Sequence, residues 1–142
     1  MNALNLPLLV AAALSAVAAG LHLAIIVGGP DWYRFFGAGE RMARAAAQGD
    51  RYPTVVTLCI AAVLAGWALY ALSGAGAIRP LPWLKFALAG ITAVYLLRGL
   101  LFVPAWRASG RALTPFAVWS SVICLGYGLI HLLGLVQVWP RL

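Results

Sequence analysis

Charge is scarce in this sequence, and negative charge is scarcest of all. Only 9% of the 142 residues are charged, and three of them are acids, Asp31, Glu40 and Asp50. A soluble domain carries roughly 25% charged residues, whereas 64% of this chain is hydrophobic. The composition therefore excludes an ordinary soluble domain and indicates a membrane protein.

Cysteine and metal-binding motifs are also scarce. Cys59 and Cys124 lie inside apolar runs, so we interpret them as small buried side chains rather than a disulfide. The sequence contains no CxxC, HExxH or histidine cluster, so we predict no metal site, cofactor or catalytic residue. The net charge of +7 comes from basic residues beside helix ends, and we expect no nucleic-acid partner.

Long hydrophobic runs, in contrast, are abundant. Each is close to the ~20 residues that cross ~30 Å of hydrocarbon. We predict an all-α, integral membrane four-helix bundle in the lipid bilayer, forming one domain over residues 1–142. Gly74 and its neighbours have the composition of a turn that follows the second span, and Pro104 should end the third span. The predicted spans cover about 4–27, 54–72, 82–103 and 115–138.

The polar stretch 28–53 joins the first two spans and holds every carboxylate of the chain. Glycines and a proline should end the first span there, and Asp31 should cap a short helix. A second, amphipathic segment follows, in which Glu40 and Arg44 have the favourable i,i+4 order. We expect this segment to be a short interfacial helix, so that 28–53 forms a cytoplasmic lid in two pieces.

Basic residues are distributed unequally between the two sides of the predicted spans. Positive charge concentrates on the cytoplasmic side of membrane proteins. The bias predicts an inner-membrane, multi-pass protein with both termini in the periplasm. Six residues share the predicted cytoplasmic side, Arg34, Arg41, Arg44, Arg51, Arg107 and Arg111, and three share the other, Arg79, Lys85 and Arg141.

Two ionisable residues lie at membrane depth near the cytoplasmic ends of their spans. His22 and Arg98 are each about six residues, roughly 9 Å, from those ends. Ionisable groups inside a membrane are costly and often functional, so both could open onto one pocket beneath the lid and attract an anion. Thr57 could add a hydrogen bond. The candidate binding residues are His22, Asp31, Tyr33, Arg34, Glu40, Tyr95 and Arg98.

A structural alternative stays open for the same residues. Arg98 could extend to the cytoplasmic interface, and His22 could be a neutral imidazole bonded to a backbone carbonyl. Lys85 reads as an interfacial anchor at the start of its span. His131 is a second candidate, on a face of small residues that favours helix packing.

Short runs carry a resemblance to known proteins. HLAIIVGGP after the first span, YPTVV, YLLRGL and SSVICLGYGL resemble runs in small four-span bacterial inner-membrane proteins of unknown function. The resemblance implies the fold and the location, and it implies no activity.

Three functions remain open from the sequence. We favour binding or transport of a small anionic or amphipathic molecule in the polar pocket, with a homo-oligomer if the molecule crosses the membrane. The second is an enzyme acting on a lipid or isoprenoid headgroup, with His22 or Glu40 as acid/base and Arg98 holding phosphate. The third is an accessory subunit of a larger membrane complex.

Overall fold

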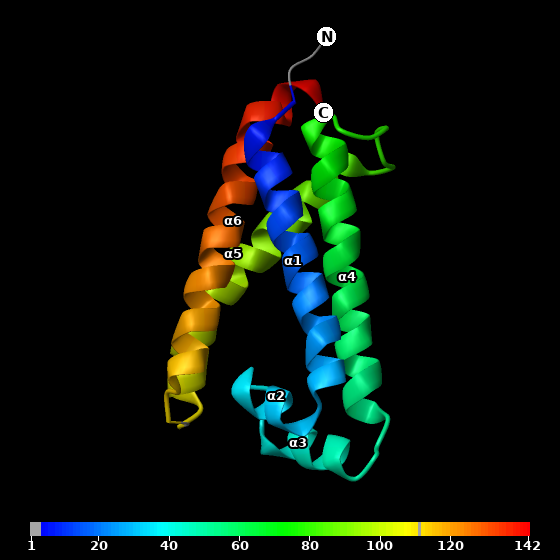
Figure 1. Cartoon of the computed structure of the whole chain (residues 1–142). Helices are drawn as coiled ribbons and strands as arrows, with labels where there is room; N and C mark the ends of the chain where they lie inside the picture. The colour runs from blue at the N-terminus through cyan, green and yellow to red at the C-terminus, as the bar shows by residue number, and fades with distance from the viewer. Residues whose placement is uncertain (1–3, 111) are drawn as a thin grey trace. The chain divides into compact units, whose positions relative to one another are not determined.

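The computed structural model describes residues 4–110 and 112–142, and its regular structure is helical (Figure 1). No strand occurs within these ranges, so the all-α prediction is confirmed. Arg111, counted above among the cytoplasmic basic residues, lies outside the described residues. The elements are α1 (Leu6–Gly28), α2 (Pro30–Phe35), α3 (Glu40–Ala47), α4 (Tyr52–Ala75), α5 (Leu84–Ala108), α6 (Pro115–Val138) and the 3₁₀ turn η1 (Trp139–Arg141).

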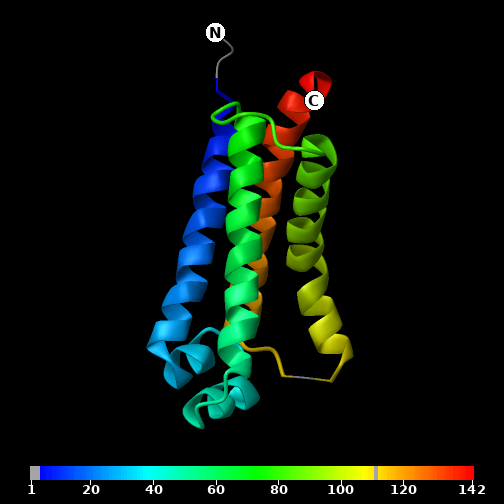
Figure 2. The same ribbon diagram turned by 90° about the vertical axis from the view of Figure 1, so that its right-hand side faces the viewer.

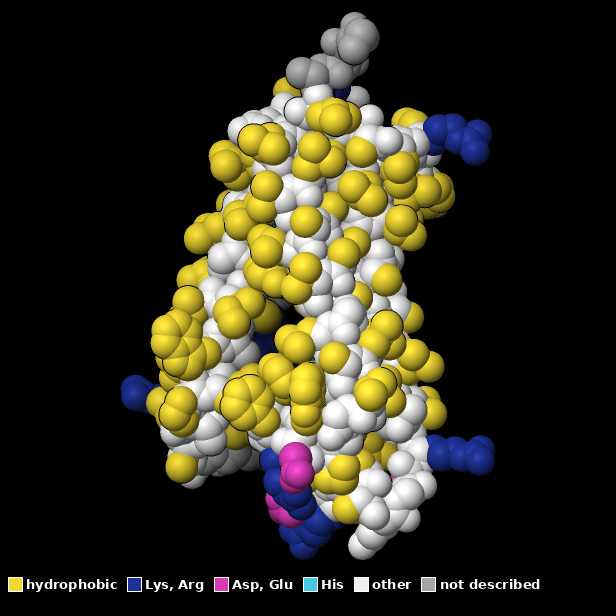
Figure 3. All heavy atoms as spheres, viewed as in Figure 1, with side chains coloured by type: hydrophobic (Ala, Val, Ile, Leu, Met, Phe, Trp, Pro, Cys, Tyr) yellow, Lys and Arg dark blue, Asp and Glu magenta, His cyan; other side chains and the backbone are white. Residues whose placement is uncertain are grey.

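The four long helices are long and apolar enough to cross a membrane. At most 33% of the most apolar window of each helix is buried, so large apolar side chains cover the outside of the helices (Figure 3). In water such a surface would aggregate, whereas lipid tails solvate it. The chain is therefore a multi-pass membrane protein. Cys59 and Cys124 are both free, and Cys59 is exposed rather than buried as predicted.

The chain divides into two compact units, which share α1 and α4. One contains the residues up to Ser15 together with 67–142, and the other contains 16–66. The division therefore falls inside two helices rather than at linkers. The prediction of a single domain stays a prediction.

In the first unit, the start of α1, the C-terminal η1 and the loop between α4 and α5 lie at the same end (Figure 2). The Asn5 backbone N–H donates to the Ala75 carbonyl at 3.0 Å, and its side-chain amide donates to Gln137 at 2.7 Å. Leu8 is fully buried beneath these bonds. It packs in one apolar cluster with Ala75, Leu88, Leu135 and Val138.

Helices α5 and α6 approach each other closely through glycines. A Cβ on Gly99 would lie 2.7 Å from the Leu125 backbone nitrogen, and one on Gly128 would lie 2.9 Å from the Leu96 backbone nitrogen. Small residues at such positions let membrane helices pack backbone against backbone. This packing confirms the role predicted for the small-residue face of residues 115–138, where Ser121 and His131 are buried.

Two helix ends differ from the sequence prediction. Helix α4 continues through Gly74 to Ala75, because the missing Cβ accommodates Leu88, whose Cδ1 lies 2.6 Å from the Cβ position. Helix α5 continues through Pro104 to Ala108. The Phe102 and Trp106 rings pack one turn apart across the proline, with centroids 5.2 Å apart. Proline removes one helix hydrogen bond, which membrane helices tolerate.

The second unit contains the lid segment. The cap of α2 is Gly29 at φ 70°, and no side chain caps this helix, so the prediction that Asp31 is the cap is wrong. Helix α3 is the predicted amphipathic helix, and Glu40 and Arg44 pair across it at 3.5 Å as expected. Tyr33, from α2, is buried together with Ile25 of α1 and Ala43 of α3. This small apolar cluster fixes both short helices against the end of α1.

Candidate functional site

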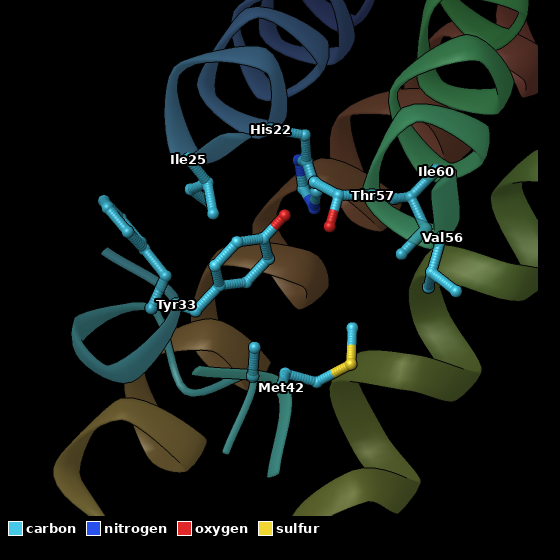
Figure 4. A pocket seen from close by; sticks show the side chains of 9 residues that line it. His22, Ile25, Tyr33, Met42, Val56, Thr57 and Ile60 are labelled. Atoms are coloured by element: carbon cyan, nitrogen blue, oxygen red, sulfur yellow. The ribbon is translucent and has the colours of Figure 1, made fainter. Parts of the chain in front are cut away.

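A cavity of about 280 Å³ lies within the second unit (Figure 4). Its walls come from the C-terminal half of α1, the segment of α2 and α3, and the N-terminal half of α4. Most of the lining is apolar, and the polar side chains come from three different elements. The lining residues are His22, Ile25, Tyr33, Phe36, Ala38, Met42, Val56, Thr57 and Ile60.

His22 presents one ring nitrogen to this cavity. Its Nδ1 lies 2.7 Å from the Ala18 carbonyl oxygen, one helical turn earlier, and a carbonyl can only accept, so Nδ1 carries the proton. In the uncharged ring, Nε2 then holds a lone pair and accepts hydrogen bonds. The backbone bond expected for a packed imidazole is confirmed, yet the ring still lines the cavity.

Tyr33 is the unusual member of the lining. Only 2% of the residue is exposed, and its hydroxyl has no hydrogen-bond partner in the described part of the chain. Figure 4 shows this hydroxyl pointing toward His22 and Thr57. A buried polar group without a partner costs about 1–3 kcal/mol, so the mostly apolar cavity holds an unsatisfied hydroxyl on the side of His22 and Thr57.

The predicted acidic residues are engaged elsewhere in the lid. Arg34 donates from Nη1 to Asp31 and from Nε to Glu40, both at 2.9 Å. The hydrogen bond from Arg34 holds the pKa of Glu40 below its usual range, and Glu40 in turn raises the pKa of Arg34. These side chains are exposed, so the pairs contribute little stability. Figure 3 shows acidic and basic side chains gathered together in this region.

Arg98 and Tyr95 belong to the first unit. Arg98 donates to the hydroxyls of Ser120 at 3.2 Å and Ser121 at 3.4 Å. Its guanidinium carbon lies 3.5 Å from the centre of the Phe102 ring. The ion pairs recorded among residues 4–110 and 112–142 do not include it. That Arg98 and His22 share one pocket stays a prediction.

Tyr95 lies at the centre of an aromatic cluster that also contains the second candidate, His131. The Tyr95 hydroxyl lies 3.0 Å from the Ser15 hydroxyl, and its ring contacts Trp67, Tyr127 and His131. His131 is fully buried, with Nδ1 2.9 Å from the Tyr127 carbonyl oxygen. Its Nε2 has no partner among the described residues. Lys85 lies over the Trp139 ring at 4.2 Å, as suits an interfacial anchor.

The structure therefore brings together three residues singled out in the sequence, His22, Tyr33 and Thr57. Sequence reasoning missed the apolar side chains around them. Helical spacing could have found part of this wall, since residues i and i+4 share a helix face and Val56 and Ile60 have that spacing on α4. It could not have found Phe36 or Met42, because their positions depend on how the lid folds.

These observations define a small α-helical, multi-pass membrane protein with an apolar pocket that contains an isolated polar spot. Comparisons of the chain with family models, curated proteins and solved structures found no match. The resemblance to small four-span bacterial proteins therefore gains no support beyond the four apolar helices themselves.

Proposed function

We propose that this protein binds a small amphipathic molecule in the cavity of residues 16–66. The observation that carries the proposal is the Tyr33 hydroxyl, buried and unpartnered beside a cavity of about 280 Å³. Binding pockets are typically apolar with a few placed polar groups that orient the ligand. The lining has this composition, because it combines three polar side chains, His22, Tyr33 and Thr57, with apolar ones.

A purely structural role accounts poorly for the same residues. If Tyr33 served only to fix the lid, phenylalanine would fill the space against Ile25 and Ala43 without the cost of a buried hydroxyl. The pocket beside this hydroxyl is partly open and has room for a small molecule. A ligand that occupies the pocket and bonds to the hydroxyl would remove the cost of the unpaired group.

The proposal includes a location. The arginine-rich lid favours the cytoplasmic side of a bacterial inner membrane, which would open the pocket to molecules from the inner leaflet or the cytoplasm. Helix α3 then lies at the interface, with Ala43 toward the protein and its charged side chains toward headgroups.

The test follows the methyl group of Met42, which lines the pocket. The chain has two methionines, so ¹³C-methyl labelling gives one signal from the site and one from Met1 at the start of the chain. In lipid nanodiscs, a panel of small amphiphiles, 4-propylphenol, 4-propylanisole and 4-propylbenzoate, is titrated against both. We expect at least one probe to shift the Met42 signal saturably, whereas general partition into the disc gives a shift that does not saturate.

Adjacent valines provide a matched pair of variants. Val56 lines the pocket, whereas Val55 is 55% exposed on the same helix. Val56→Phe should abolish the saturable shift by filling the cavity, and Val55→Phe should leave it unchanged. Ala38→Leu fills the same cavity from the lid and repeats the test on another element. If no probe shifts Met42 saturably in the wild-type protein, the proposed function is wrong.

A further inference from the structure

We propose that the pocket selects an uncharged molecule with a hydroxyl head and a compact apolar body, about the size of a substituted phenol. This inference rests on the proposed function and specifies its ligand. It departs from the anion expected from the sequence, and three properties of the lining carry it: charge, hydrogen-bonding pattern and size.

The first property is the absence of charge from the described lining, which contains no Asp, Glu, Lys or Arg. Among the charged groups nearest in sequence, Asp31, Arg34, Glu40 and Arg44 pair with one another in an exposed cluster. Arg41, next to Met42, is exposed and does not belong to the lining. A carboxylate or phosphate moved into this pocket would lose part of its hydration without gaining a counter-charge from the lining, which disfavours its binding. An uncharged head avoids that penalty.

The second property is the pattern of donors and acceptors. Because the Nδ1 proton of His22 is held by the Ala18 carbonyl, Nε2 of the uncharged ring is an acceptor. The Tyr33 hydroxyl can donate and has no other partner in the described chain. A ligand hydroxyl matches this pair, since it can donate to His22 Nε2 and accept from Tyr33 at once. In Figure 4 both groups, with Thr57, point toward the same part of the cavity.

The third property is the size and character of the remaining space. Apolar side chains from α1, α3 and α4, including Ile25, Met42 and Val56, form most of the wall. A dry apolar cavity of about 150 Å³ is sufficient to bind benzene, and this one is about 280 Å³. It therefore has room for a single ring with a short chain, or for a branched alcohol of similar volume.

The decisive experiment compares, on the Met42 methyl signal, the three probes that share a 4-propylphenyl body and differ in the head group. We expect 4-propylphenol to bind about tenfold more tightly than 4-propylanisole, because the ether cannot donate to His22 and one hydrogen bond is worth up to about a factor of ten. The carboxylate 4-propylbenzoate should not bind measurably. Equal binding of phenol and ether, or tighter binding of benzoate, would overturn the inference while leaving the proposed function intact.

Tyr33→Phe separates binding from folding. Removing an unpartnered buried hydroxyl should leave the thermal midpoint unchanged or raise it, since no internal bond is lost. The same change should reduce the affinities of 4-propylphenol and 4-propylanisole alike, several-fold, because the oxygen of each probe can accept a hydrogen bond from Tyr33. A lowered midpoint with unchanged affinities for both probes would show that Tyr33 is structural and would contradict its assigned role.

The hydroxyl could come from a free small molecule or from the head of a membrane lipid. Lipids extracted from the purified wild-type protein and from Val56→Phe distinguish the two by mass spectrometry. Enrichment of a hydroxyl-headed lipid in the wild type alone identifies a lipid ligand. Equal lipid content, with 4-propylphenol binding intact, identifies a free one. Both results require the phenol preference, so its absence overturns the inference in either case.

Discussion

Arg98 carries a positive charge in a membrane helix, and its partners are neutral. Two serine hydroxyls accept its hydrogen bonds, and the Phe102 ring lies against its plane. Serine oxygens and an aromatic face each supply partial negative charge, so the guanidinium is solvated by several weak interactions. Planarity matters for this arrangement, because only a flat group can contact the ring while it reaches both serines.

Arg98→Lys should therefore lower stability by about 0.5–1.5 kcal/mol, even though the charge is retained. Phe102→Leu should cost a similar amount, and the double variant should cost less than the sum of the two. Thermal unfolding in detergent, monitored by circular dichroism, measures all three. Strictly additive losses would mean that the ring and the guanidinium do not interact energetically.

At the scale of elements, the pairing of α5 with α6 depends on where glycine occurs. Gly99 places its Cα against the backbone of α6, whereas a Cβ on Gly90 of the same helix would meet no atom within 4 Å. The same substitution should therefore have opposite effects at the two sites. At Gly99 a methyl group would force the helices apart, and at Gly90 it would favour the helical conformation.

Gly99→Ala should destabilise the protein by about 1–3 kcal/mol, the usual cost of an overpacked contact. Gly90→Ala should be neutral or stabilising by up to about 1 kcal/mol. Comparing their thermal midpoints in one detergent tests the close approach directly. Equal effects of the two variants would contradict it.

The elements also show how far sequence patterns reach. Hydropathy is a local property, so the four spans could be predicted from runs of apolar residues alone. The ends of the helices were harder to predict from the sequence, because a glycine or a proline such as Gly74 or Pro104 ends a helix only where the surrounding packing does not favour it. In both cases packing decides, through Leu88 at Gly74 and through the Phe102 and Trp106 rings at Pro104.

Part of the candidate site could likewise be predicted from the sequence, and part could not. His22 and Tyr33 could be singled out because an ionisable or polar group near a membrane helix end is conspicuous in sequence. The spacing predicted the pair of Glu40 with Arg44, but it could not predict that Arg34 pairs with both Asp31 and Glu40, since several basic residues lie within reach along the chain. In the structure, Asp31 and Glu40 form ion pairs with Arg34 outside the pocket. The pocket lining therefore contains no carboxylate or arginine, and the ligand we propose is an uncharged molecule rather than an anion.

At the scale of the whole molecule, the distribution of arginine sets the expected orientation. In a background with Cys59 and Cys124 replaced by serine, single cysteines can be placed in the exposed lid, as Gln48→Cys, and in the loop between α4 and α5, as Ala77→Cys. In intact cells a membrane-impermeant maleimide should label Ala77→Cys, and it should label Gln48→Cys only after disruption. The reverse pattern would place the lid and its pocket outside the cytoplasm.

The hydrogen bond between Asn5 and Gln137 joins residues that are 132 positions apart in the chain. A ribosome adds about 5–20 residues per second, so the start of α1 is made on the order of ten seconds before its partner exists. During that interval the Asn5 amide enters the membrane environment without its final acceptor. The hydrogen bond that closes this end of the first unit can therefore form only after α6 has been made.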